Sequence, residues 1–202
     1  VPAEGSSSLW NPLLMNGPIS QGTGSNSPVK QFAVNLFHSG GTGGRPGQDG
    51  LSATAFPSGV RNTPVEISET IAPLIIRRKE YRQDSGGAGH YRGGLGQTME
   101  VEHADNRALV VSAMFDRVLN PARGRDGGMG GANGAVTLKS GKVLAGKGRQ
   151  PVPAGDTLCL EMPGGGGLGD PAKRLAESVA CDVRDELISS EQARDAYKVI
   201  CT

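Results

Sequence analysis

Residues 68–96 carry the sequence SETIAPLIIRRKEYRQDSGGAGHYRGGLG, in which an apolar run, a dense group of charges and a glycine-rich segment follow one another. The apolar run at 71–76 is suited to a hydrophobic core, whereas the charges at 77–84 must reach water or pair with one another. The glycines at 86–96 leave a backbone that can approach another surface closely, because it lacks most of its Cβ atoms. The stretch therefore predicts a chain that leaves a core, passes a polar edge and enters a glycine segment.

Glycine is the unusual residue of the whole chain. It makes up 32 of the 202 residues, about twice the usual share of 7%. There is no G-X-Y period and no sustained low-complexity tract, which excludes collagen and disorder and favours many tight turns between short strands. The 21 Lys and Arg residues nearly balance the 20 Asp and Glu residues, giving a net charge of +1. The charge therefore predicts neither a nucleic-acid partner nor an anionic membrane surface.

The three cysteines, Cys159, Cys181 and Cys201, are far apart and lack the Cys/His spacing of a zinc site. They are typical of reduced thiols in a cytoplasmic protein. The chain has no run of 18 apolar residues and no N-terminal signal pattern, so we expect a soluble, cytoplasmic protein. Because Val1 is not a methionine, the chain is interpreted as a processed product or a piece of something longer.

Several short segments have the pattern of β-strands. Two-residue alternation predicts half-buried strands near 32–36, 65–68, 98–103 and 158–161, an apolar run predicts one at 109–113, and residues 135–144 have the pattern of a hairpin. The sequence thus predicts a β-dominated α+β fold, in which short strands are joined by glycine-rich loops and a two-helix tail closes the chain. Its expected parts are an extended N-terminal segment (1–29), a β-rich body (30–163), and a glycine linker with the C-terminal helical tail (164–202).

The tail carries the clearest helix signals. Asp170 is a predicted N-cap with Pro171 in the first helical position, and apolar residues recur at every fourth position from Leu175 to Leu187. Ser189 and Gln192 have the spacing of a capping box for a second helix. The apolar stripes of both helices need a surface to cover, either the β body or a partner.

Three candidate sites remain open between a structural and a functional interpretation. Arg45 and Asp49 lie in a glycine loop that lacks the Lys-Ser/Thr ending of a phosphate-binding loop, so they form either a loop-internal ion pair or a contact to a ligand or another chain. Glu66 and Glu69 are either a solvated pair or carboxylates that share a metal. His103, between acidic neighbours, is interpreted as a surface residue in preference to a ligand.

Five motifs occur in a fixed order, namely GGTGGRPGQDG at 40–50, RNTPVE at 61–66, ETIAPL at 69–74, the segment at 82–96, and EMPGGGGLGDP at 161–171. They lie within residues 40–171, and the resemblance that they carry extends over nearly all of residues 30–200. In this order they resemble the C-terminal part of hydantoinase B/oxoprolinase proteins.

The resemblance implies an enzyme subunit that opens a cyclic amide, such as a hydantoin or 5-oxoproline, together with an ATP-using, hydantoinase A-type partner subunit. The similar acetone carboxylases use the same pair of subunits for ATP-dependent carboxylation of a ketone. In this family a divalent metal is bound by His and Asp residues upstream of the part present here, and ATP acts through the partner. We therefore expect no metal or nucleotide to be held by this chain alone, whose histidines His38, His90 and His103 match no metal cluster.

Six polar residues, each in a Gly- or Pro-rich context, are the candidates for orienting substrate, a phosphorylated intermediate or a subunit contact: Arg45, Asp49, Arg61, Glu66, Asp84 and Arg92. Arginine suits such a role because its planar guanidinium matches carboxylate and phosphate groups. No residue is assigned a proton-transfer role. The alternatives are a non-catalytic assembly module that docks the upstream half and the ATP-using subunit, a subunit of a ketone carboxylase, and a stand-alone small-molecule binding protein.

Overall fold

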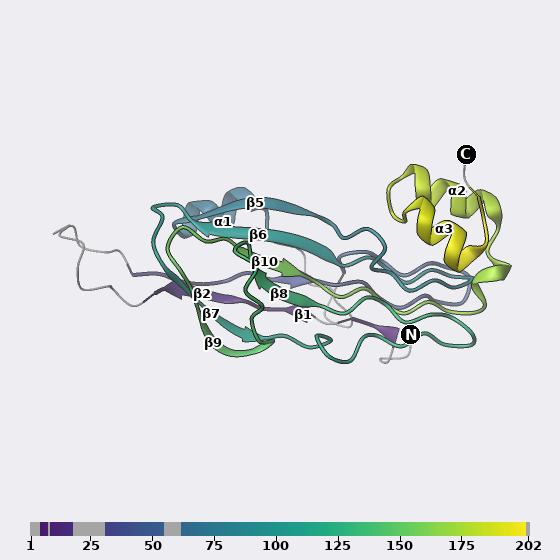
Figure 1. Ribbon diagram of the computed structural model, residues 1–202, viewed down its shortest axis with the longest axis horizontal. Coiled ribbons are helices and arrows are strands. Elements are labelled where there is room, and N and C mark those ends of the chain that lie inside the picture. Colours follow the sequence, from purple (N-terminus) through teal and green to yellow (C-terminus); the bar gives the residue numbers. More distant parts are fainter. Residues whose placement is uncertain (1–4, 8, 18–30, 55–61, 201–202) are drawn as a thin grey trace.

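The computed structural model describes residues 5–7, 9–17, 31–54 and 62–200, and strands dominate them (Figure 1). One antiparallel sheet has the order β5-β6-β10-β8 and consists of β5 (Leu74–Tyr81), β6 (Gln97–His103), β8 (Ala135–Leu138) and β10 (Leu158–Glu161). A second has the order β3-β2-β7-β9 and consists of β2 (Leu13–Asn16), β3 (Ala33–Asn35), β7 (Leu109–Met114) and β9 (Lys147–Val152). A small sheet pairs β1 (Leu9–Trp10) with β4 (His38–Ser39). The predicted β-dominated α+β class is confirmed.

The two larger sheets share one hydrophobic core. Strand β6 alternates strictly, so that Met99 and Val101 are fully buried while their neighbours are half-buried. These side chains belong to the same cluster as Leu14 of β2, Val111 of β7 and Leu158 of β10. Burying each such side chain contributes about 2 kcal/mol. The two-residue period of the sequence therefore corresponds to a core between two sheets.

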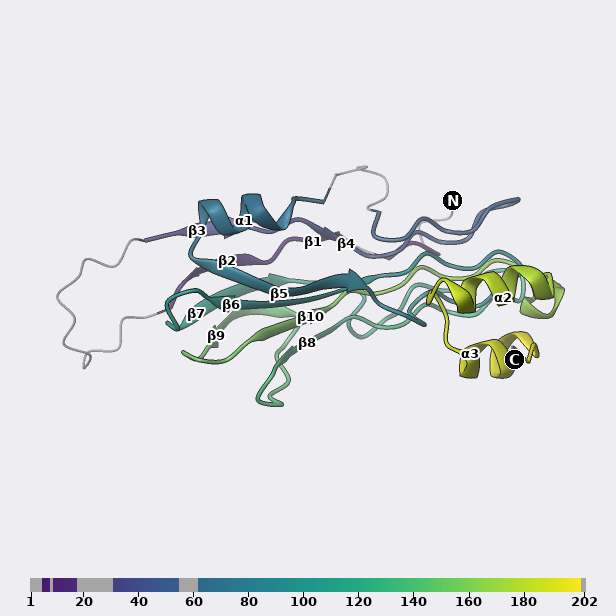
Figure 2. The same cartoon turned by 90° about the horizontal axis from the view of Figure 1, so that it is seen from above.

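Four glycine-rich segments extend from one end of the sheets and run side by side (Figures 1 and 2). We call them the glycine bundle, defined as residues 40–50, 85–96, 122–134 and 163–169. Backbone hydrogen bonds join the segments, for example from Gly94 N to Thr42 O (2.8 Å) and from Gly87 N to Gly165 O (2.8 Å). The bundle is thus held together by backbone groups, although these residues contribute almost nothing to the named strands and helices.

The segment Gly164–Gly167 is at the centre of the bundle and is buried. Cβ atoms added to its four residues in turn would lie 1.7–2.1 Å from the carbonyl oxygens of Ser85, Thr42, Arg123 and Ala88. Ser85 and Ala88 belong to the same neighbouring segment, and they face Gly164 and Gly167. The direction in which a Cβ atom would point therefore repeats after three residues, which is the period of a polyproline II helix. The N–H groups of Gly164 and Gly167 follow the same period, because they bond to the carbonyls of Ala132 and Met129. The run predicted to be a linker is therefore buried backbone inside the bundle.

The helical tail, residues 170–200, covers the far end of the bundle (Figure 1). It contains a 3-10 turn, η2 (Pro171–Lys173), and the helices α2 (Ala176–Arg184) and α3 (Ser190–Tyr197). The Asp170 side chain accepts a hydrogen bond from Ala172 N (2.9 Å), but it caps the turn η2 and not the predicted first helix, which begins only at Ala176. The predicted cap of the second helix is confirmed, since the Ser189 side chain accepts a hydrogen bond from Gln192 N (3.0 Å).

The apolar residues of the tail pack on the glycine bundle. Val179, Ile188, Ala193 and Tyr197 form a buried cluster with Ala88 of the bundle. The same chain therefore covers the middle of the predicted stripes, whereas Leu175 (70%) and Ile200 (81%) at their ends are exposed. No helix among the described residues is long and apolar enough to cross a membrane.

The strand predicted at 65–68 is wrong, because these residues begin the helix α1 (Val65–Ile71). Pro64 at the N-cap has φ −57°, and Glu66 places a negative charge in the first turn. The short alternation of Val65 and Ile67 with polar residues has the period of a strand and gave no sign of this helix. The helix buries only Ser68, and Ile67 is 51% exposed.

Strand β5 was missed because its charges hide the pattern of an edge strand. Its Arg77 pairs with Glu102 of β6 (2.5 Å), and its Arg78 lies 3.7 Å from Glu100. Cross-strand pairs of this kind allow a charged segment to join a sheet. The polar edge expected after the apolar run is thus the outer strand of a sheet.

Packing at the centre of the bundle predicts a large effect for one added methyl group. We expect Gly165→Ala to lower the free energy of unfolding by about 3 kcal/mol, the upper range for overpacking, because rigid backbone surrounds the site. The matched control is Gly5→Ala, where the nearest atoms would be 3.6 Å from the new Cβ. Urea unfolding of both variants measures the difference, and equal stabilities would contradict a closely packed bundle.

Candidate functional site

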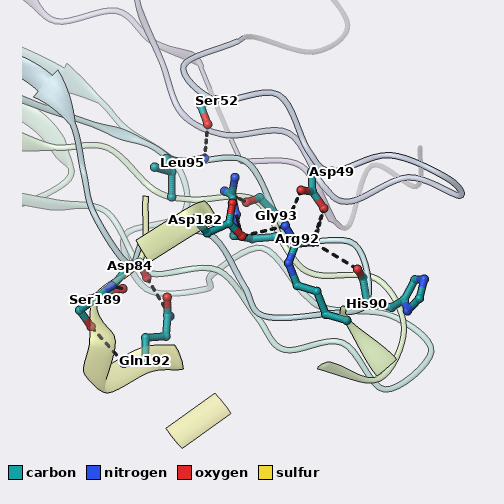
Figure 3. A network of polar contacts seen from close by, with 11 residues as sticks. Asp49, Ser52, Asp84, His90, Arg92, Gly93, Leu95, Asp182, Ser189 and Gln192 are labelled. Carbon is teal, nitrogen blue, oxygen red and sulfur yellow. Dashed lines mark hydrogen bonds and ion pairs between the residues drawn. The ribbon is translucent and has the colours of Figure 1, made fainter. Parts of the chain in front are cut away.

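Asp49 lies at the centre of a polar network where the tail meets the glycine bundle (Figure 3). Its carboxylate accepts two hydrogen bonds from the Arg174 guanidinium, both 2.7 Å, and a third from the backbone N–H of Arg92 (2.7 Å). Burial alone raises the pKa of Asp49, but the hydrogen bonds and positive charges of Arg174 and Arg92 outweigh it and lower the pKa below its ordinary value. This carboxylate is therefore ionised and held in place from both sides.

Asp182 of α2 extends the network into the protein. It is 6% exposed and accepts hydrogen bonds from Arg174 (2.7 Å) and from Arg92 Nε (3.3 Å). Arg92 is 4% exposed and also donates to the carbonyl of Gly93 (2.9 Å). Two carboxylates and two guanidiniums thus balance in charge, which is the condition for burying them at acceptable cost.

Asp84, directly before the bundle segment 85–96, makes a second contact to the tail (Figure 3). Its carboxylate accepts a hydrogen bond from Ser189 N (2.7 Å), and its backbone oxygen accepts one from the Gln192 side chain (3.4 Å). Asp84 also has φ 62°, a left-handed conformation that costs energy for residues other than glycine. The contacts to α3 are what hold the residue in this conformation.

A surface cavity of about 650 Å³ lies beside the network, lined among others by His90, Tyr91, Arg125 and Lys173. It is continuous with the network through His90, whose carbonyl accepts a hydrogen bond from Arg174 (3.2 Å). The His90 ring contacts the carbonyl of Lys173 through Nδ1 (2.9 Å). The cavity is therefore formed jointly by the bundle and the tail.

The remaining candidates of the sequence lie elsewhere or bind differently. Arg45 donates a hydrogen bond to the backbone oxygen of Asp49 (3.4 Å). The carboxylate of Asp49 forms its ion pair with Arg174 and not with Arg45. Glu66 and Glu69 are exposed, and α1 lies at the opposite end of the molecule from the tail (Figure 2). Arg61 lies outside the described residues. The structure thus brings together Asp49, Arg92 and, nearby, Asp84 and Arg45.

Sequence reasoning missed Arg174 and Asp182, which complete the network. Asp182 follows Val179 by three residues and therefore lies on the buried face of α2. The sequence contained this signal, because Val179 belongs to the predicted apolar stripe. Arg174 follows the last glycine motif directly but gives no comparable signal. Only the folded chain places it 2.7 Å from Asp49, 125 positions away in sequence.

His38 of β4 is a buried ionisable residue near the origin of the first glycine segment. It is 2% exposed, and neither ring nitrogen makes a hydrogen bond among the described residues. Burial and, after it, the charge of Lys79 lower the pKa of His38 to about 3, against the opposing effect of the neighbouring Gln97 side chain. His38 is therefore neutral at physiological pH.

A resident metal ion would need several donor side chains close together. Within the described ranges, no three His, Cys, Asp or Glu side chains are grouped so that they could hold a metal ion. The described residues therefore do not fit a resident metal.

Breaking the network predicts a loss of stability. We expect Arg174→Gln to lower the free energy of unfolding by about 3 kcal/mol, because Asp49 and Asp182 would lose their shared cation in a mostly buried place. Arg194→Gln is the control, since its ion pair with Asp195 is exposed and contributes little. Chemical unfolding compares the variants, and equal loss in both would show that the network is not stabilising.

The neutral state of His38 predicts a dependence of stability on pH. An unfolded histidine binds a proton below about pH 6.5, whereas the folded His38 does so only near pH 3. Stability should therefore fall as the pH drops from 6.5 towards 3, by about 2 kcal/mol at pH 5 from this residue. In His38→Gln the loss between pH 7.5 and 5 should be smaller by that amount in urea unfolding; an unchanged slope would contradict the assignment.

Comparison with known proteins agrees with the motifs. The family model described as Hydantoinase B/oxoprolinase matches residues 1–171. A protein of Pseudomonas sp. (strain NS671), named as one of the subunits of a putative D-/L-hydantoinase, is 32% identical over 170 residues, which cover 81% of this chain and 28% of that protein. The beta subunit of the caprolactamase of Pseudomonas jessenii is 33% identical over 147 residues, which cover 67% of this chain and 25% of that protein.

A solved structure shares the fold. The ATP-dependent caprolactamase from Pseudomonas jessenii is similar over 100% of this chain and 36% of its own chain, with a TM-score of 0.77 and 22% identity. The chain spans about a quarter of the length of the curated relatives described above. The family match over most of the chain confirms the resemblance, and the chain belongs to the hydantoinase B/oxoprolinase family.

Proposed function

We propose that this chain is the C-terminal part of a cytoplasmic subunit that acts with an ATP-using partner subunit to hydrolyse a cyclic amide of the hydantoin or 5-oxoproline type. The observation that carries the proposal is the family match over residues 1–171. The likeness of the whole chain to the fold of an ATP-dependent caprolactamase supports it. Two relatives are themselves named as subunits, which favours action within a complex.

A cyclic amide is a poor electrophile because resonance delocalises the nitrogen lone pair into the carbonyl group. ATP, bound by the partner subunit, would supply the phosphoryl group that activates the ring oxygen. The metal-binding residues would belong to the upstream part of the subunit, since the described residues offer no cluster for one.

In this scheme the present chain supplies a rigid framework. The glycine bundle has no side chains to rearrange at its centre, and the charge network fixes the tail on its end through Asp49, Arg174 and Asp182. Preorganised frameworks of this kind hold reacting groups from other segments at fixed positions. The cavity beside His90 and Lys173 is the part of this frame that is open to an intermediate or to another subunit.

A second candidate, a non-catalytic assembly module, is favoured by one specific observation. Three of the predicted site residues, Asp49, Asp84 and Arg92, are already occupied by contacts to the tail. Residues that bind their own chain are suited to building a docking surface. In this case the tail would matter for complex formation and not for turnover within the formed complex.

The test is reconstitution of the complete subunit that contains this chain with its A-type partner. We expect ring opening of hydantoin, 5-oxoproline or caprolactam to require ATP and to release one ADP for each ring opened, measured by chromatography and a coupled ADP assay. Ring opening without nucleotide would contradict the proposal, and bicarbonate-dependent consumption of a ketone would replace it with the carboxylase alternative.

The same assay separates the second candidate when residues 170–202 are deleted. Loss of co-purification with full turnover of any complex that still forms supports assembly alone. An intact complex without turnover excludes a purely docking role. Arg194→Gln serves as the control, because it changes the surface of the tail without touching the network.

A further inference from the structure

The end of the molecule opposite the tail has a second cavity, at the open end of the two sheets. It has a volume of about 610 Å³ and lies between β3, the turn from α1 to β5, and the end of β6. This volume is in the range of small-molecule sites, which often lie at the mouths of β structures. The cavity is far from the charge network, since α1 and the tail lie at opposite ends in both views (Figures 1 and 2).

His103 is the buried polar residue of this cavity, and the expectation of a surface residue is wrong. It ends β6 on the face that points to the core, which leaves it 6% exposed. Its Nδ1 accepts a hydrogen bond from Asp105 N (3.0 Å), so the neutral ring carries its hydrogen on Nε2. Nε2 has no hydrogen-bond partner among the described residues, although it is buried. A buried donor of this kind is costly unless something binds it.

Charges of both signs surround this donor. Arg107 and Asp105 both act on His103 electrostatically, and both line the cavity with Glu69. One oxygen of Glu69 accepts a hydrogen bond from Ile76 N (2.8 Å), which holds the carboxylate at the turn after α1. The cavity therefore offers one guanidinium and one imidazole N–H for an anion, and two carboxylates for a cation.

Apolar groups form the rest of the wall. The Phe32 ring meets His103 edge to face, with centroids 6.0 Å apart. Ile71, which is 59% exposed at the end of α1, and Pro73 line the same space. A ligand with two charged ends and a short hydrocarbon body would match both the charges and these surfaces.

We propose that this cavity binds a small zwitterionic amino acid, with its carboxylate on Arg107 and the His103 Nε2–H and its ammonium group on Glu69 and Asp105. The proposal rests on the proposed function for lactam substrates of the 5-oxoproline type, because hydrolysis of a lactam yields such a molecule, whereas opening a hydantoin leaves the nitrogen carbamoylated. Water adds across the ring C–N bond, the carbonyl carbon becomes a carboxylate, and the nitrogen leaves as an ammonium group. The cavity is thus a site for the ring-opened product class.

The direct test is calorimetry of the complete subunit that contains this chain with 4-aminobutanoate, 6-aminohexanoate and glutamate. Hexanoate and hexylamine each lack one charged group and are the matched comparisons. We expect at least one amino acid to bind, and removal of either charged group to weaken binding by about tenfold, the effect of one charge-assisted hydrogen bond. Absence of binding by all three amino acids, or equal binding of hexanoate and 6-aminohexanoate, would overturn the proposal.

Variants assign the binding to this cavity. Arg107→Gln should weaken amino acids and hexanoate alike by about tenfold. Glu69→Gln keeps an oxygen for Ile76 N and should weaken amino acids but not hexanoate. Arg149→Gln, an exposed change on β9 outside the cavity lining, is the control and should bind as wild type.

His103→Gln tests the buried donor, and Arg107→Gln and Glu69→Gln carry the experiment if that variant does not fold. Unchanged binding in both of these variants would place the ligand elsewhere and refute the assignment. Binding uses no ATP, so it is independent of the reconstituted reaction. Amino acid binding without ATP-dependent ring opening would contradict the proposed function alone. ATP-dependent ring opening without amino acid binding would contradict only this site.

Discussion

Close contact between glycine backbones is the constraint on which this structure depends. At Gly164–Gly167 each missing Cβ faces a carbonyl oxygen of a neighbouring segment, so no other residue type fits without moving the backbone. The segments can then satisfy their polar groups with one another, although they contribute almost nothing to the named sheets. The high glycine content therefore reflects packing between segments more than turns within them. Glycine loses more conformational entropy on folding than other residues do, and these contacts and the core must offset that cost.

A bundle without side chains can carry specificity only at its surface and its ends. The end near the tail is closed by charges, where Arg92 from the bundle and Arg174 from the tail share Asp182. Such a buried pair of ions contributes less to net stability than its short distances suggest, because each charge loses its hydration. Its stronger effect is on register, since a tail displaced by one helical turn would separate Asp49 from Arg174 and Arg92 from Asp182. The network thus decides where α2 lies on the bundle.

The sequence predicts some elements well and others not at all, and the reason is physical. Strand β6 and the Ser189 cap depend on local periodicity and on a side chain bonding its own helix, so they are visible without a fold. Helix α1 buries only Ser68 and shows no apolar stripe on its inner face, so its pattern gave no helix. The bond between Arg174 and Asp49 joins residues 125 positions apart, and no local pattern encodes it. The six candidate site residues were selected by their glycine and proline neighbours. This criterion identifies rigid backbone, but it does not identify side chains that bind a ligand or react.

The two ends of the molecule differ in how their charged side chains are used, and this difference bears on where ligands bind. Near the tail, Asp49 and Arg92 find partners within the chain, and little of their binding capacity is left over. At the opposite end, the His103 Nε2–H is buried without a partner in the described residues, beside a cavity with charges of both signs. A fold tolerates an unsatisfied buried donor where another molecule completes it. Glycine-rich motifs, which identify the family, therefore mark the framework. His103, one of several buried groups without a partner in the described residues, lies beside a cavity at an ordinary strand end.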